Sequence, residues 1–184
     1  MGHAIPVPAS ACDGTSICGR LRWSADMSVV FTIGYEGVDL DSFLNAIEEH
    51  GIDLLVDIRL NPISRKRGFS KRQLAAAVEA RGISYAHYPH LGCPADIRAE
   101  YALTGDFGRY TRIYQARVLS RRLALLARVA RVSRARRVCL LCFEADANRC
   151  HRSLVAASAA RLNQSPAGFY HLAVPSSGRT SPVP

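Results

Sequence analysis

One loop of this sequence, residues 142–152, concentrates side chains that titrate, attack electrophiles or bind metals. It contains two thiols, two carboxylates, an imidazole and a guanidinium: Cys142, Cys150, Glu144, Asp146, His151 and Arg152. A loop that only reverses the chain is normally built from Gly, Asn, Pro or Ser. The composition of residues 142–152 therefore predicts a functional site, without specifying its chemistry.

Four interpretations of the two cysteines follow from their setting. Cys150 precedes an apolar run that is typical of a helix, so the helix dipole together with His151 and Arg152 would lower its pKa and make it a nucleophile. The two cysteines could also form a redox pair, with Cys142 as the resolving thiol. They could hold a metal together with a histidine. Finally, both could be buried structural thiols, which is a common environment for free cysteine.

Hydrophobic runs predict the elements that position this loop. Buried strands are expected at residues 29–33, 54–58, 83–88, 138–141 and 169–174. Helices are expected after Asp39 or Asp41, from Ser70 to about 80, over about 109–133, and from Cys150 or Ser153 to about 162. Residues 93–108 look irregular apart from one short helix. Strands that alternate with helices predict a single α/β domain with a mostly parallel, Rossmann-like sheet of about four to five strands.

Functional side chains follow the predicted strands at the points where those strands end. In open parallel sheets, ligands bind outside the carboxyl ends of the strands. We therefore expect the polar residues of four loops to meet at one edge. These are Tyr35 and Glu36, then Asp57, Arg59, Ser64 and Arg65, then Tyr85 and His87, and finally the residues of the 142–152 loop.

Converging arginines at this edge predict an anion site. Arg59, Arg65 and Arg152 would orient a phosphate or carboxylate, while His87 or Glu144 would transfer protons. The same arginines could instead pair with the neighbouring carboxylates in a buried network. A second basic surface is expected on the 109–133 helix, where Arg117, Arg121, Arg128 and Arg131 would form one stripe.

The combined motifs resemble the family of domain of unknown function number 488. The resemblance covers about residues 29–174 and rests on Thr32 to Gly37, Asp57 to Arg59, Pro62, Ser64, Arg65, Gly68 to Ser70, Tyr85, His87, Leu91, Gly92, and Leu141 to Arg152. It implies an α/β fold and the importance of the two loop cysteines, and it supplies no substrate.

Composition narrows the class of protein. The 184 residues carry a net charge of +9, which suggests a polyanionic or phosphorylated partner. No apolar run reaches the roughly 20 residues of a membrane span, and no secretory signal is visible, so a cytoplasmic location is expected. Residues 1–27 and 175–184 are expected to be irregular extensions that flank a domain at 28–174.

The sequence therefore predicts an anion-binding site at the strand edge, and its first functional hypothesis is a cysteine-dependent enzyme. Cys150, Cys142, His87 and Glu144 would be catalytic, and the substrate would bear a phosphate or nucleotide. It would be bound by Tyr35, Glu36, Asp57, Arg59, Ser64, Arg65, Tyr85, His151 and Arg152. Two alternatives stay open. The first is a nucleic-acid-binding accessory protein without chemistry, which would use the arginine stripe and the basic residues of 65–72, and the second is a metal-binding protein that uses Cys142 and Cys150. The sequence predicts no particular oligomeric state.

Overall fold

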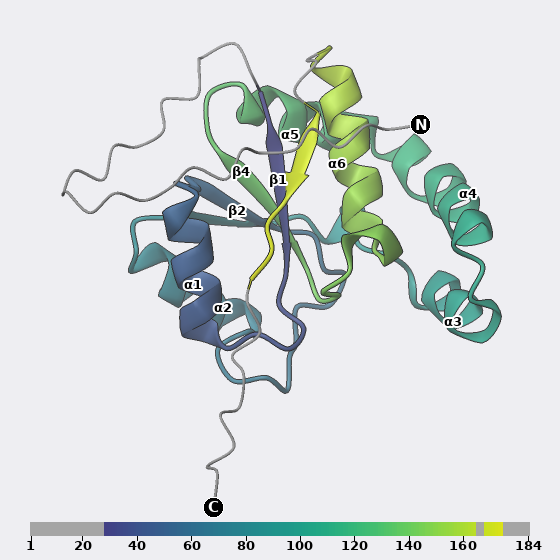
Figure 1. The fold of residues 1–184 in the computed structure, drawn as a ribbon. Coiled ribbons are helices and arrows are strands. Elements are labelled where there is room, and N and C mark those ends of the chain that lie inside the picture. Colours follow the sequence, from purple (N-terminus) through teal and green to yellow (C-terminus); the bar gives the residue numbers. More distant parts are fainter. Residues whose placement is uncertain (1–27, 165–167, 175–184) are drawn as a thin grey trace, which may run out of the picture.

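Five parallel strands form the centre of the structure, a computed structural model that describes residues 28–164 and 168–174 (Figure 1). The strands lie side by side in the order β3-β2-β4-β1-β5. Their bounds are β1 Val30–Gly34, β2 Leu54–Asp57, β3 Ser84–His87, β4 Val138–Cys142 and β5 Phe169–His171. The predicted α/β fold with a Rossmann-like sheet is confirmed, and every strand pairing is parallel.

Six α-helices of the described residues flank this sheet. They are α1 Leu40–Glu49, α2 Lys71–Glu79, α3 Ala95–Thr104, α4 Phe107–Arg117, α5 Leu123–Ser133 and α6 His151–Leu162. Short 3-10 turns occur at Pro89–Leu91, Leu119–Arg121 and Ala147–Arg149. None of the described helices combines the length and apolar character that crossing a membrane requires.

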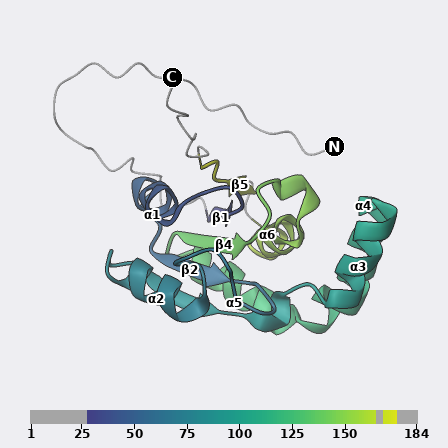
Figure 2. The ribbon, with the colours of Figure 1, turned by 90° about the horizontal axis from the view of Figure 1, so that it is seen from below.

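Alternating side chains of the strands build two hydrophobic cores, one on each face of the sheet. Leu55 and Leu141 pack under α1 and α2, whereas Val56 and Leu140 pack under α4, α5 and α6. In Figure 2, α1 and α6 lie on opposite sides of β1, and α3 and α4 lie at the end of the molecule away from α1 and α2. The central strands β1, β2 and β4 are buried on both faces, which explains why they read as apolar runs in the sequence, whereas the edge strands β3 and β5 are partly exposed.

The connections diverge at the carboxyl end of β4. The chain leaves β1 and β2 toward the face of α1 and α2, but it leaves β4 toward α6 on the opposite face. Since β4 lies between β2 and β1, loops diverge on both sides of its end. This divergence is the topological switch point at which open α/β sheets bind ligands, and the 142–152 loop begins there.

One detail of the predicted helices is wrong. The expected 109–133 helix is divided into α4 and α5 by the turn at Leu119–Arg121, which buries Val118 and Leu119 in the same core as Tyr114 and Leu126. The arginine stripe is therefore not continuous. The short helix expected within residues 93–108 is the ten-residue helix α3, which buries only Ile97 among its own residues and so shows little periodicity. The extensions expected at residues 1–27 and 175–184 lie outside the described residues.

Candidate metal centre

Four potential metal ligands meet where β4 ends and α6 begins. The Sγ atoms of Cys142 and Cys150, a carboxylate oxygen of Glu144 and a ring nitrogen of His151 all lie within 4.8 Å of one another. We call these four residues the thiol cluster. Both cysteines and His151 are buried, and Glu144 is partly buried. The cluster confirms that the chemistry-bearing residues of this loop converge.

Local sequence explains how a loop of this length brings its two ends together. Asp146 accepts a hydrogen bond from Asn148 N and so starts the 3-10 turn that reverses the chain. Cys150 then caps α6, with its Sγ 3.5 Å from the backbone nitrogen of Arg152. His151, as the first residue of α6, directs its ring back toward the end of β4.

Hydrogen bonds inside the thiol cluster define its geometry. The thiols of Cys142 and Cys150 donate to the same oxygen of Glu144, over 2.8 and 3.0 Å. The Nδ1 atom of His151 lies 3.7 Å from the first sulfur and 3.8 Å from the second. Its Nε2 atom lies 3.5 Å from the Ile58 carbonyl oxygen and 3.9 Å from the Cys142 sulfur.

Burial controls the ionisation of these groups. It raises the pKa of Cys150 well above its usual value, and the neighbouring Cys142 adds to the effect. Burial also disfavours the charged forms of Glu144 and His151. The two thiol donors nevertheless lower the pKa of Glu144, and the nearby negative groups raise the pKa of His151. The expectation that the helix dipole lowers the pKa of Cys150 is therefore wrong, because desolvation outweighs the dipole at this depth.

Arg152 lies beside the cluster as a buried cation. Its side chain is 1% exposed, and its guanidinium donates to the backbone carbonyls of Glu144 and Ala145. Its Nε atom is buried without a hydrogen-bond partner. Among the described residues, no carboxylate lies within ion-pair distance of Arg152. A buried charge without a counter-charge is costly, so this position calls for a negative group nearby.

Glycine at position 34 makes room for the loop. A Cβ atom there would lie 1.8 Å from the carbonyl oxygen of Glu144 and 3.1 Å from the Arg152 guanidinium. Gly34→Ala is therefore expected to displace the loop and to lower the free energy of unfolding by about 3 kcal/mol. Chemical denaturation of the matched variant Gly108→Ala should show a change within about 1 kcal/mol, because that glycine lies in α4 with its nearest neighbour at 3.3 Å. Equal effects of the two substitutions would contradict the tight approach at Gly34.

The predicted binding residues of the β2 and β3 loops form a separate, buried network. Arg59 donates Nε and Nη2 to the two carboxylate oxygens of Asp57, over 2.9 and 2.6 Å. Its Nη1 donates to the Tyr35 hydroxyl and to the Phe69 carbonyl. The Tyr85 hydroxyl donates to Asp57 over 2.6 Å. The guanidinium of Arg59 is thus fully engaged inside the protein.

Other predicted site residues lie around this network and do not join the thiol cluster. His87 has Nε2 2.9 Å from the Arg59 carbonyl oxygen, two strands away from β4. Glu36 accepts a hydrogen bond from Ala145 N and so holds the 142–152 loop. Ser64 accepts a bond from Lys66 N, and Arg65 is exposed. Catalytic and binding roles for these residues stay predictions.

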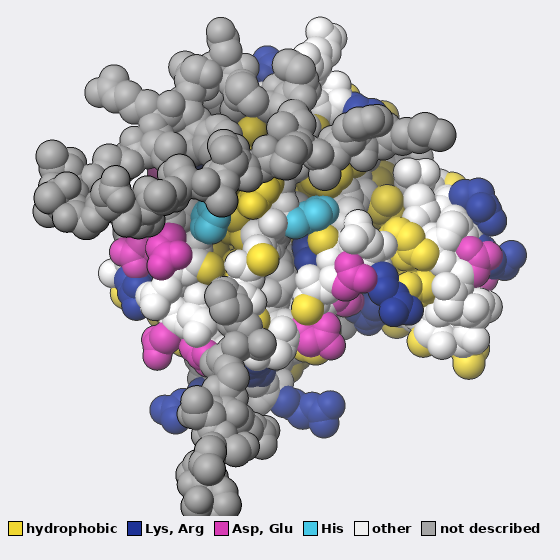
Figure 3. Space-filling view, viewed as in Figure 1, with side chains coloured by type: hydrophobic (Ala, Val, Ile, Leu, Met, Phe, Trp, Pro, Cys, Tyr) yellow, Lys and Arg dark blue, Asp and Glu magenta, His cyan; other side chains and the backbone are white. Residues whose placement is uncertain are grey.

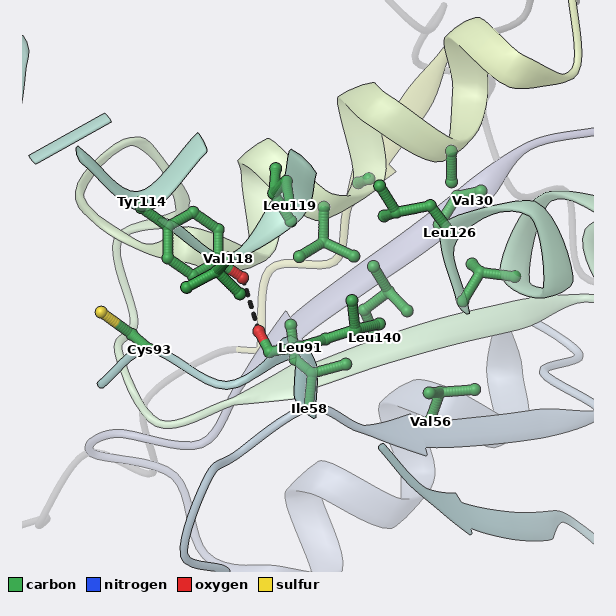
Figure 4. Close-up of a cluster of buried hydrophobic side chains, with 14 of the residues drawn as sticks. Val30, Val56, Ile58, Leu91, Cys93, Tyr114, Val118, Leu119, Leu126 and Leu140 are labelled. Atoms are coloured by element: carbon green, nitrogen blue, oxygen red, sulfur yellow. Dashed lines mark hydrogen bonds between the residues drawn. The ribbon is translucent and has the colours of Figure 1, made fainter. Parts of the chain in front are cut away.

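The sequence analysis did not identify two side chains near the thiol cluster, those of Tyr114 and Cys93. The ring of Tyr114 meets that of His151 edge-on, with the ring centroids 5.5 Å apart. The Tyr114 hydroxyl donates to the Leu91 carbonyl, beside Cys93 (Figure 4). Burial raises the pKa of Cys93 to about 11, and the charges of Glu144 and Cys150 affect it as well. The available signal was the position of Cys93 after β3, in a loop at the same sheet edge.

Comparison with known proteins gives one result that bears on the site. A family model described as domain of unknown function DUF488 matches residues 39–159, which is more than half of the chain. The match runs from the cap of α1 into α6 and therefore includes the whole thiol cluster. Neither the curated proteins nor the solved structures gave a match.

Proposed function

Because the chain belongs to the DUF488 family, whose description names no activity, we propose from its own geometry that it binds a zinc ion in the thiol cluster. The observation that carries this proposal is the convergence of two sulfurs, one imidazole nitrogen and one carboxylate oxygen within 4.8 Å. Sulfur and nitrogen donors favour zinc, which prefers four ligands in a tetrahedral arrangement.

The distances support a tetrahedral site. Zinc–sulfur bonds of about 2.3 Å and zinc–nitrogen bonds of about 2.0 Å place the sulfur and nitrogen about 3.6 Å apart at a tetrahedral angle. The two observed separations from His151 Nδ1 are 3.7 and 3.8 Å. The shorter sulfur–oxygen contacts to Glu144 belong to thiols that still carry protons. Loss of those protons would release the carboxylate, whose oxygen has to move away from the sulfurs by about 0.7 Å to reach the tetrahedral separation.

Charge balance supports the same conclusion. Two thiolates, one carboxylate and one neutral imidazole around a divalent ion leave one net negative charge. Arg152 supplies one positive charge beside the cluster, without a carboxylate partner among the described residues. The loaded site would thus provide the counter-charge that buried Arg152 lacks. The contact of His151 Nε2 with the Ile58 carbonyl is the type of outer interaction that orients metal-bound histidines.

The enzyme hypothesis is less well supported by this geometry. A nucleophilic cysteine needs a lowered pKa and access to a substrate, whereas Cys150 is 1% exposed and its pKa is raised by burial. The guanidiniums of Arg59 and Arg152 are both engaged with groups of the protein itself. Four protein ligands without an open position are typical of a structural zinc site.

Zinc affinity measured against pH tests the proposal. The metal must displace the protons of the two thiols that donate to Glu144, and burial keeps the pKa of Cys150 high. We therefore expect one zinc per chain and an affinity that falls about 100-fold for each unit of decreasing pH between about pH 8 and pH 7. The fall should steepen at lower pH, where His151, whose pKa is raised, takes up a third proton.

The measurement is a competition titration of metal-free protein against a chromophoric chelator, with the stoichiometry checked by elemental analysis. Cobalt(II) serves as a second readout, because its absorption spectrum reports thiolate ligation and four-coordination. Substoichiometric zinc, or an affinity that does not change with pH, would be incompatible with a two-thiolate site.

A further inference from the structure

A second charged feature lies away from the thiol cluster, in the connection between β2 and α2. Residues 58–78 contain no Asp or Glu but carry five cations in addition to buried Arg59: Arg65, Lys66, Arg67, Lys71 and Arg72. Four of these, all except Lys66, are exposed. We call residues 61–72 the basic loop. In Figure 3, dark blue side chains project at the lower end of the molecule, where Figure 1 shows the connection leading into α2.

These four exposed cations have no internal partner among the described residues. In the described part of the chain, the exposed ion pairs join other arginines to carboxylates: Arg81 to Glu48, Arg109 to Glu100 and Arg117 to Asp96. The expected stripe on α4 and α5 is thus partly neutralised as well as divided. The basic loop instead carries four exposed cations within residues 65–72, in a stretch, residues 58–78, that contains no carboxylate side chain.

Hydrogen bonds hold the basic loop in one conformation. Ser70 Oγ accepts from Ser64 N and donates to Ser64 O, and Lys71 N donates to Pro62 O. Phe69 is fully buried and stacks on Tyr35, and its carbonyl accepts from Arg59. Arg59, Tyr35 and Ser64, which the sequence suggested as substrate-binding residues, therefore hold the basic loop in position through these contacts. A surface that is ordered before binding loses less conformational entropy when a partner binds.

The start of α2 adds to the positive potential. Its first turn contains Lys71 and Arg72 and no acid, although negative side chains are the ones stabilised at this end of a helix. Ser70, at the capping position, makes no side-chain hydrogen bond to the helix because its hydroxyl is bound to Ser64. The arrangement opposes the helix dipole, and an anionic partner would relieve the repulsion.

We propose that the basic loop is a contact surface for the phosphate backbone of a nucleic acid. Three of its four exposed cations are arginines, whose planar guanidinium matches phosphate in a bidentate manner. An anionic membrane is the weaker fit. The basic loop exposes one large apolar side chain, Ile63, and so offers little apolar area to insert among lipids. The proposal does not depend on zinc binding, because the thiol cluster follows β4 whereas the basic loop follows β2.

The test is the salt dependence of oligonucleotide binding by the full chain, measured by fluorescence anisotropy with labelled single-stranded and duplex DNA of about 20 nucleotides. The variant is Arg65→Gln, Arg67→Gln, Lys71→Gln and Arg72→Gln combined. The matched control removes the same charge from α4, the following turn and α5: Arg112→Gln, Arg121→Gln, Arg122→Gln and Arg131→Gln, all exposed. Thermal unfolding of both variants shows whether the fold is retained.

Four lost phosphate contacts should lower the affinity at about 0.1 M salt by at least about 100-fold and flatten the slope of log K against log salt by about 3. The control should lose less than about tenfold. Three results would overturn the proposal: no binding by the unmodified chain at about 50 mM salt, equal losses in the two variants, or loop-dependent binding to phosphatidylserine vesicles but not to DNA.

Discussion

Replacing Cys142 and Cys150 together with serine is expected to lower the zinc affinity of the chain by about 10,000-fold or more. Structural zinc binds with an apparent free energy of about 10–16 kcal/mol at neutral pH, spread over four ligands. A serine hydroxyl does not give up its proton near neutral pH and so cannot take the place of a thiolate. Elemental analysis after gel filtration, followed by chelator competition, gives the loss directly.

The chain supplies matched controls for this experiment. Cys93 and Cys139 are also free and buried, and Cys139 lies on the opposite face of the sheet, under α1 and α2. Serine at both of these positions removes the same number of buried thiols and should leave the zinc stoichiometry unchanged. Loss of zinc in this control pair, or its retention in the Cys142 and Cys150 pair, would rule out the proposed ligands.

Much of the fold could be predicted from hydrophobic patterns alone. The central strands, buried on both faces, are apolar runs, and their alternation with helices leads to a parallel sheet. The division of the 109–133 region could not be predicted in this way, since no Gly or Pro lies between Arg109 and Ser133. The turn that divides it buries Val118 and Leu119 in the core shared by α4 and α5. Helix α3 did carry signals, Pro94 at its start and Gly105 at its end.

The candidate site was predictable in its position but not in its partners. Parallel strands bring their following loops to one edge, which is enough to expect the convergence of the 142–152 loop with others. Which histidine reaches the sulfurs depends on strand order. Because β2 separates β3 from β4, His87 lies near Arg59, and His151 takes the place beside the cysteines.

Burial is the other quantity that the sequence did not supply. A cysteine at a helix start with His and Arg beside it suggests a reactive thiolate, yet the depth of Cys150 reverses the direction of its pKa shift. Arginines at a strand edge suggest an anion site, yet the guanidinium of Arg152 is enclosed and bound to backbone carbonyls. In both cases removal from water changes what the residue does: the thiol of Cys150 keeps its proton, and the guanidinium of Arg152 binds the protein's own carbonyls.

Asp57→Ala is the substitution expected to destabilise the fold most. Asp57 is fully buried and Arg59 is 6% exposed, so removal of the carboxylate would leave a buried guanidinium without its counter-charge and Tyr85 without its acceptor. Breaking a buried pair in this way costs about 3–5 kcal/mol. The midpoint of thermal unfolding should fall by about 10 °C in a chain of this size.

An exposed pair of the same length separates the effect of burial from that of charge. Arg81 and Glu48 also lie 2.6 Å apart, but their side chains are 35% and 53% exposed. Glu48→Ala should therefore cost less than about 1 kcal/mol. The double variant Asp57→Ala with Arg59→Met should recover part of the lost stability, because it removes the stranded charge. A small effect of Asp57→Ala would instead show that Arg59 does not depend on this carboxylate. Arg59 would then again be a candidate for binding an external anion.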